Sequence, residues 1–169
     1  RHTGVRCDWS SDVCSSDLAA GSNRALVGEF PKNQWFSLGE KRGLGYAQNL
    51  GIGKALEGGA GSVLILDQDT LPEADMVCVL AETLVSSSTP DSHVAAVGAR
   101  YVGARNSHPS FFVQFRRFRF KKCFCAEGGI RQVIPADVLI SSGALFSASA
   151  LREIGAMDEG LFIDHVDTE

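Results

Sequence analysis

The chain has 169 residues, an apolar content of 44% and a formal net charge of −4 at pH 7. This combination is typical of one α/β domain with a hydrophobic core, and the negative charge gives no general reason to expect nucleic-acid binding. No apolar run approaches the ~18 residues of a membrane-spanning helix and no signal peptide is recognisable, so we expect a cytoplasmic protein.

Residues 1–18 lack the apolar periodicity and the capping residues of a structured element. The run from Arg6 to Leu18 resembles the conceptual translation of a sequencing-library adapter, so we expect residues 1–18 to be disordered and non-native. We assign residues 19–169 to the domain itself. Because the chain stops at Glu169 inside an acidic motif, we expect a fragment, truncated at both ends and inactive by itself.

The first strong helical pattern follows Gly43 and stops at Gly58-Gly59, as a glycine-terminated helix does. Its apolar positions fall roughly on one face, although the segment from Gly43 to Glu57 contains four glycines. A glycine inside a helix costs ~1 kcal/mol relative to alanine. We therefore expect the backbone of this helix to approach a sheet or a ligand closely.

The next stretch, Ser62–Thr70, joins a short aliphatic run to two carboxylates, Asp67 and Asp69. The run is long enough for a buried strand and too short for a helix. Ligands bind at the carboxyl ends of strands in open α/β sheets, and Mg²⁺ and Mn²⁺ favour oxygen ligands that they share with phosphates. The pattern favours a metal–diphosphate site. The alternative is that Asp69 caps the following helix and Asp67 only solvates the strand end.

The rest of the chain alternates helical and strand patterns. We expect a helix over Glu73–Val85, a buried strand over Val94–Gly98, a strand over Val138–Phe146 that is broken at Gly143, and a short helix over Ser149–Gly155. Helices and strands at this spacing are typical of a mostly parallel sheet.

A basic and aromatic segment interrupts this alternation. Eight of the sixteen basic residues fall between Arg100 and Arg131, against one acid, Glu127. Within it, the partial alternation of Phe111–Phe120 predicts a half-exposed strand with a cationic outer face. Such a strand is either a solvated sheet edge or a surface that meets anionic lipid headgroups or a diphosphate, where each cation contributes ~1 kcal/mol.

Four segments together resemble a family 2 glycosyltransferase with the GT-A fold, and more narrowly a bacterial rhamnosyltransferase. Gly43–Gly51 resembles the family's G-x-A-x-A-x-N-x-G helix, and Leu66–Thr70 resembles its L-D-Q-D-[ST] metal motif. Ser141–Gly143 resembles its I-S-S-G strand, and Ile154–Glu169 resembles G-x-[MF]-D-E-x-L-F-I-D-x-V-D-x-E-W without the tryptophan. Each motif alone is weak, but the four occur in the right order over more than a hundred residues.

The resemblance implies a fold and a set of roles. The fold is a Rossmann-like, mostly parallel sheet flanked by helices. The metal ligands are Asp67 and Asp69, for Mg²⁺ or Mn²⁺. The catalytic base is Asp164 or, as the alternative, Asp167, and His165 occupies the position where relatives often have the base. The implied donor-binding residues are Gly43, Asn49, Asp67, Ser142 and Gly143.

The chemistry implied by the resemblance is an inverting displacement. The donor is a nucleotide-diphosphate sugar, dTDP-rhamnose, and the acceptor is a lipid-linked or polysaccharide hydroxyl in cell-surface glycan synthesis. Such an acceptor would bring Phe111–Lys122 to the inner face of the bacterial membrane as a peripheral contact. Two alternative functions remain. One is a haloacid-dehalogenase-type phosphatase, although Asp67–Leu71 is one residue shorter than its D-x-D-x-T-L motif because Thr70 follows Asp69 directly. The other is a non-catalytic membrane-surface module.

Overall fold

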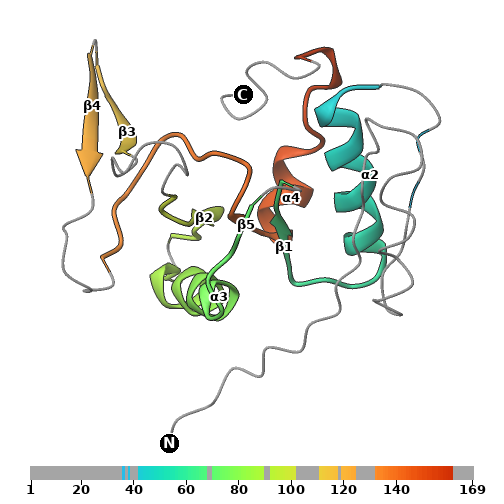
Figure 1. Cartoon of the computed structure of the whole chain (residues 1–169), viewed down its shortest axis with the longest axis horizontal. Coiled ribbons are helices and arrows are strands. Elements are labelled where there is room, and N and C mark those ends of the chain that lie inside the picture. Colours follow the sequence, from blue (N-terminus) through green and yellow to red (C-terminus); the bar gives the residue numbers. More distant parts are fainter. Residues whose placement is uncertain are drawn as a thin grey trace, which may run out of the picture. The chain divides into compact units, whose positions relative to one another are not determined.

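The computed structural model describes residues 36, 38, 42–67, 70–89, 92–101, 111–117, 119–124 and 132–161, whose ribbon is shown in Figure 1. They belong to two compact units, which we describe separately. The first unit takes the chain up to Val63 together with residues 148–167, and the second takes Leu64–Ser147. The sequence also contains two weak strand patterns, Ala25–Val27 and Trp35–Leu38, which lie largely outside the described residues.

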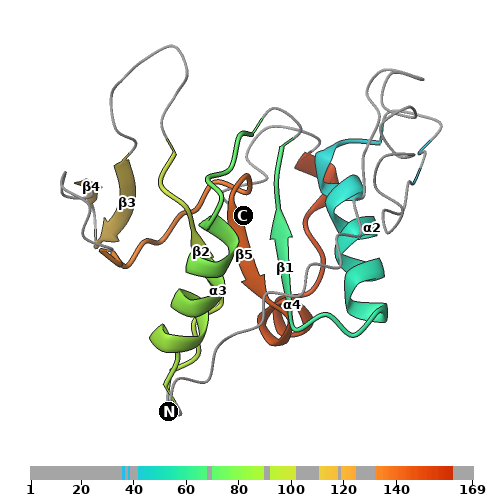
Figure 2. The ribbon, with the colours of Figure 1, turned by 60° about the horizontal axis from the view of Figure 1, so that its bottom comes forward.

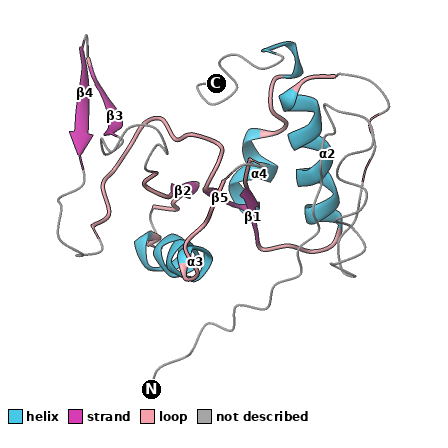
Figure 3. Ribbon diagram, viewed as in Figure 1, coloured by secondary structure: helices cyan, strands magenta, loops and turns pink. Residues whose placement is uncertain are grey.

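The first unit is helical. Helix α2 spans Leu44–Glu57, α4 spans Ala148–Ile154, and the 3₁₀ helix η1 spans Glu159–Leu161 (Figure 3). The bounds of α2 agree with the sequence prediction: it follows Gly43, whose φ of 92° is left-handed, and ends at Gly58. Helix α4 also occupies its predicted segment, and Gly155 with φ 90° ends it.

The backbone of α2 is closely approached at Gly45, but by the segment before η1, where the sequence predicted a sheet or a ligand. A Cβ atom at this position would lie 2.9 Å from the carbonyl oxygen of Asp158, a distance that real Cβ contacts do not reach. The segment before η1 therefore packs directly on the backbone of α2. Gly53, farther along the same helix, has no such neighbour: among the described residues, no atom outside the helix backbone lies within 4 Å of the place that a Cβ atom would take.

A three-stranded sheet has the order β1-β5-β2, with β1 at Ser62–Ile65, β5 at Ala144–Ser147 and β2 at Ala96–Gly98. Strand β5 is antiparallel to β2, with Leu145 opposite Val97. One hydrogen bond joins the residue before β5 to the end of β1 (Gly143 N–H to Ile65 O), and another joins the residue after β5 to the start of β1 (Ala148 N–H to Gly61 O). This pattern makes β1 and β5 antiparallel as well, as their arrows in Figure 2 show.

The α/β class is confirmed, but these three strands contain no parallel neighbours. The expectation of a mostly parallel sheet rests on alternating helix and strand patterns, which do not reveal that the last strand inserts between the first two. Strand β1 is expected to be buried, and its residues are only half-buried. Strand β5 begins at Ala144, later than Val138, because residues 141–143 form the predicted break.

The core of the second unit lies between α3 (Met76–Ser87) and strands β2 and β5. Its buried side chains are Leu80, Leu84, Val97 and Leu145. The predicted helix begins at Glu73, but Met76 N–H bonds to Glu73 O as a separate turn, and α3 starts at Met76. Helical spacing predicts Met76, Val77, Leu80 and Leu84 as the inward positions. Leu80 and Leu84 are buried and Met76 packs against them, whereas Val77 is half-buried.

The basic and aromatic segment is a β-hairpin. Strand β3 spans Phe111–Arg116 and pairs antiparallel with β4, Arg119–Phe124. The single strand predicted over Phe111–Phe120 is therefore wrong, because the chain reverses at Arg117, whose φ is 48°. Tight hairpin turns usually carry glycine, asparagine or aspartate at such positions, and the sequence offers none here.

Within the described part of the chain, no helix has both the length and the apolar character needed to cross a membrane.

A pair of glycine substitutions in α2 tests the packing at Gly45. Gly53→Ala should raise the free energy of unfolding by about 0.5–1 kcal/mol, because alanine loses less backbone entropy in a helix. Gly45→Ala should lower it by about 1–3 kcal/mol, since the methyl group overpacks against the Asp158 carbonyl. Urea unfolding of both variants measures the difference. Equal stabilisation by the two substitutions would show that the segment before η1 does not pack on α2.

Candidate functional site

The candidate site is built in the second unit, where β1 ends. Asp67 follows the strand by two residues and is exposed, and Thr70 N–H donates a 3.1 Å hydrogen bond to the Asp67 carbonyl. This bond joins the two ends of the segment that contains the acidic motif. Gln68 and Asp69 lie outside the described residues, so the predicted role of Asp69 as a metal ligand remains a prediction.

Ser142 connects the acidic motif to the turn before β5. Its hydroxyl accepts a 3.0 Å hydrogen bond from Asp67 N–H and shares a 2.6 Å hydrogen bond with the hydroxyl of Thr70. Seventy-five residues separate Asp67 from Ser142 in the chain. The sequence motifs around these two residues thus meet in space, and one side chain holds both ends of the Asp67–Thr70 segment.

Gly143 fixes the turn on which Ser142 stands. Its N–H donates to Ile65 O at 2.8 Å, and its carbonyl accepts from Ala99 N–H at 2.9 Å, so it bridges the residues at the ends of β1 and β2. Its φ of 83° is left-handed, a conformation that strains any residue with a Cβ atom. Space is not the constraint, because a Cβ atom would lie 3.5 Å from that of Ala99. The backbone conformation therefore requires glycine here.

The chemistry of these groups fits a small cation that is shared with a phosphate. Such ions are commonly held by one or two carboxylates while the remaining positions go to water and phosphate oxygens. Asp67 supplies one carboxylate at an exposed strand end, and the Ser142 hydroxyl contacts the Asp67 backbone N–H and the Thr70 hydroxyl. Among the described residues there is no group of three or more His, Cys, Asp or Glu side chains that could hold a metal by themselves.

The family resemblance implies that Asn49 binds the donor. In the structure, its side chain contacts Met157 and Glu159 within the first unit. Its amide nitrogen donates to the carbonyl of Met157 and to a carboxylate oxygen of Glu159, both at 2.9 Å. Its amide oxygen accepts from Met157 N–H at 2.7 Å. Asn49 thus fastens the segment before η1 to α2, next to the close approach at Gly45. Its contact with a donor remains a prediction.

Gly43 caps the start of α2 through its backbone, and its carbonyl accepts from Ala47 N–H. Asp164, His165 and Asp167, the candidate bases, lie outside the described residues. The choice among them therefore stays open, as the sequence left it.

Two features were not found from the sequence. Thr70 enters the sequence analysis only as the last residue of the metal motif. Its hydrogen bond with Ser142 is found only in the structure. Gln48 on α2 is 8% exposed, and neither polar atom of its side chain has a hydrogen-bond partner among the described residues. Buried amides without partners are rare in native proteins, and the glutamine has no sequence signal that distinguishes it from a surface residue.

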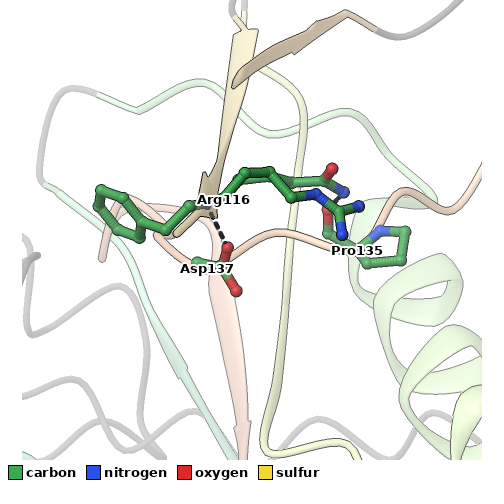
Figure 4. A pocket seen from close by; sticks show the side chains of 5 residues that line it. Arg116, Pro135 and Asp137 are labelled. Atoms are coloured by element: carbon green, nitrogen blue, oxygen red, sulfur yellow. Dashed lines mark hydrogen bonds between the residues drawn. The ribbon is translucent and has the colours of Figure 1, made fainter. Parts of the chain in front are cut away.

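A shallow pocket of about 160 Å³ lies beside β3 (Figure 4). Gln114, Phe115, Arg116, Pro135 and Asp137 line it. Its polar groups largely bond to one another: Gln114 donates to the Pro135 carbonyl, and Phe115 N–H donates to the Asp137 carboxylate at 2.6 Å. It shares no residue with the Asp67–Ser142 cluster, and we assign it a structural role.

Removing the Ser142 hydroxyl tests the cluster. Ser142→Ala should lower the free energy of unfolding by about 1–3 kcal/mol, because Asp67 N–H and the Thr70 hydroxyl lose their partner. Thr70→Val should cost less, and the double variant should cost less than the sum, with a coupling of about 0.5–1.5 kcal/mol. Chemical denaturation of the four proteins in this cycle measures the coupling.

Ser86→Ala, which changes an exposed serine on α3, is the control. Additive effects would show that the two hydroxyls do not interact.

Comparison with known proteins relates the chain to a glycosyltransferase. No family model matches the chain, and no solved structure matches it. The chain is 28% identical, over 152 residues, to the dTDP-rhamnosyl transferase RfbF of Shigella flexneri. The match covers 85% of this chain and 46% of that protein, so the chain spans about half the length of its relative. The similarity supports a rhamnosyltransferase-like glycosyltransferase, in agreement with the resemblance of its motifs.

Proposed function

We propose that this chain is part of an inverting family 2 glycosyltransferase that transfers a sugar from a nucleotide-diphosphate donor. The donor is dTDP-rhamnose, and the acceptor is a hydroxyl of a lipid-linked or polysaccharide glycan. The observation that carries the proposal is the Ser142 hydroxyl, which joins the acidic motif at the end of β1 to the small-residue turn before β5. The similarity to a dTDP-rhamnosyl transferase supports the choice of donor.

In this proposal the end of β1 is the donor diphosphate site. Asp67 and Asp69 would hold Mg²⁺ or Mn²⁺, and Ser142 contacts Asp67 and Thr70 on either side of Asp69 in the sequence. The bound cation would supply charge neutralisation to the departing nucleotide diphosphate. Gly143 leaves the turn without a side chain, which lets a ligand approach its backbone closely.

The acceptor hydroxyl attacks the anomeric carbon of the sugar as the bond to the diphosphate breaks, which inverts that centre. A carboxylate of the final acidic motif takes the hydroxyl proton, as a general base does. We assign this role to Asp164, with Asp167 as the alternative. The Asn49 contacts to Met157 and Glu159 support this arrangement, because they fix the segment that leads into the motif.

We also propose that the domain has the GT-A fold. Helix α2, strands β1, β5 and β2, and helices α3 and α4 form the described part of a GT-A domain. The remaining strands and the nucleotide-base contacts of such a domain would come from other parts of the protein.

The metal role of the acidic motif is tested with dTDP, the nucleotide that the donor releases on sugar transfer. Asp69→Ala should reduce the Mn²⁺-dependent affinity for dTDP by about 10–100-fold, the range seen when groups around a bound metal are removed. Titration calorimetry with and without Mn²⁺ measures this. Glu73→Ala removes the same charge from an exposed position just beyond the motif and should bind normally. If Asp69→Ala also binds normally, the aspartates only cap and solvate the strand end. Binding that never requires the metal would contradict the metal role of the motif.

The identity of the base is tested by separating transfer from donor binding. Asp164→Asn should lower the rate of sugar transfer by about 10²–10⁴-fold, the usual contribution of a general base, while donor affinity stays unchanged. Transfer assays and calorimetry on the same preparation give both quantities. An equal loss of donor affinity would make Asp164 a structural or metal residue. An active Asp164→Asn beside an inactive Asp167→Asn would move the base to Asp167.

A further inference from the structure

The hairpin β3–β4 separates its side chains into two chemically different faces. Phe111 is paired with Phe124, and Phe115 with Phe120. Residues directly opposite in an antiparallel ladder point to the same side, and so do residues two apart along a strand. Four phenylalanines therefore share one face, which we call the phenylalanine face. Their exposed fractions are 41% for Phe111, 62% for Phe115, 64% for Phe120 and 56% for Phe124.

The opposite face carries the cations. Arg116 is paired with Arg119, and Gln114 with Lys121, so these side chains alternate with the phenylalanines. Lys122 lies on the phenylalanine face, with its ammonium 4.2 Å from the centre of the Phe111 ring. Phe111–Phe124 contains five basic residues and no acid, in a chain whose net charge is −4. The hairpin is therefore both the most aromatic and the most cationic element described.

Among the described residues, the contacts of the hairpin with the rest of its unit hold one edge, and the four rings of the phenylalanine face stay 41–64% exposed. Asp137 N–H donates to Val113 O, and the Asp137 carboxylate accepts from Phe115 N–H. Val113 also forms a bridge with Val138. Isolated two-stranded hairpins are marginally stable in water, and contiguous exposed apolar side chains mark interaction surfaces. The phenylalanine face is expected to meet a partner.

We propose that this partner is an anionic lipid surface, on which the hairpin lies with its phenylalanine face inserted at the headgroup level. Amphipathic elements that bind membranes in this way carry aromatic and apolar side chains on one side and lysine or arginine on the other. Basic residues near such a surface are attracted by its negative potential. The hairpin combines both properties.

Two other occupants fit these observations less well. A second copy docked through the same face would bring two clusters of five cations together, which costs electrostatic energy. Single-stranded nucleic acid stacks its bases on aromatic rings while basic groups in the same groove follow its backbone. Here Arg116, Arg119 and Lys121 lie on the face away from the four rings, so a stacked strand would meet only Lys122 among the described cations of the hairpin. The potential of an anionic membrane extends over a Debye length of about 8–10 Å and so acts on cations of both faces.

The proposal does not depend on the transferase assignment, because its test measures lipid binding and not sugar transfer. The probes are vesicles of phosphatidylcholine alone and vesicles of phosphatidylcholine mixed with phosphatidylglycerol. The protein should sediment with the anionic vesicles and not with the neutral ones, and added salt should weaken the binding.

Two hairpin variants separate the cationic from the apolar contribution. Arg119→Gln/Lys121→Gln should lower partitioning about 25-fold, at roughly five-fold per cation. Phe115→Ser/Phe120→Ser should remove the part of the binding that survives at high salt. Val85→Ser and Arg152→Gln, exposed residues outside the hairpin, should bind like the unmodified protein. Hydrogen exchange with and without vesicles should show protection of β3 and β4, which locates the contact even if the phenylalanine variant misfolds.

Several results would overturn the proposal. Equal binding to both kinds of vesicle, or none to either, would remove the anionic lipid surface as partner. Binding by both hairpin variants at the level of the controls would place the contact elsewhere on the protein. An anisotropy change with a single-stranded oligonucleotide, in a protein that ignores vesicles, would assign the face to nucleic acid. A dimer in light scattering that Phe115→Ser/Phe120→Ser converts to monomer would assign it to a second copy.

Discussion

The candidate site depends on one hydroxyl group. Where β1 ends, the backbone N–H of Asp67 has left the strand ladder and needs an acceptor, and Ser142 supplies it. The same oxygen bonds to Thr70, so both ends of the acidic segment are tied to the turn that precedes β5. Together with the bond from Gly143 N–H to Ile65 O, this contact ties the end of β1 and the residues after it to the turn before β5. Ser142, which the family resemblance implies binds the donor, thus has a structural role in holding the acidic segment.

Two glycines, one in each unit, are required for different reasons. Gly143 is required for its left-handed backbone, which aims the Ser142 side chain and bonds to the ends of two strands. In the other unit, Gly45 is required for space, because the Asp158 carbonyl occupies the place of its side chain. Asn49 then completes the attachment with three hydrogen bonds. Two motifs that resemble ligand-binding signatures therefore also have a structural role, and substitution within them will affect stability as well as function.

Sequence patterns predicted those parts of the fold that local periodicity and terminal glycines determine. The bounds of α2 and the inward positions Leu80 and Leu84 followed from helical spacing and from such glycines. The insertion of β5 between β1 and β2 could not be predicted, since it depends on pairing between residues far apart in the chain. The hairpin was missed because Arg117 makes its turn without a turn-forming residue. The family resemblance brought Asp67 and Ser142 into one hypothesis, but only the structure shows the bond between them.

The proposed function depends on the binding of a cation and a nucleotide diphosphate to the Asp67–Thr70 segment at the end of β1. The most direct test is a crystal of the protein soaked with Mn²⁺ and dTDP, with data collected at a wavelength where manganese scatters anomalously. We expect one anomalous peak at about 2.1 Å from a carboxylate oxygen of the motif, the usual distance for small divalent ions, with the Ser142 contacts to Asp67 and Thr70 preserved. A peak elsewhere in the protein, or nucleotide bound with no metal at this strand end, would contradict the proposed donor site.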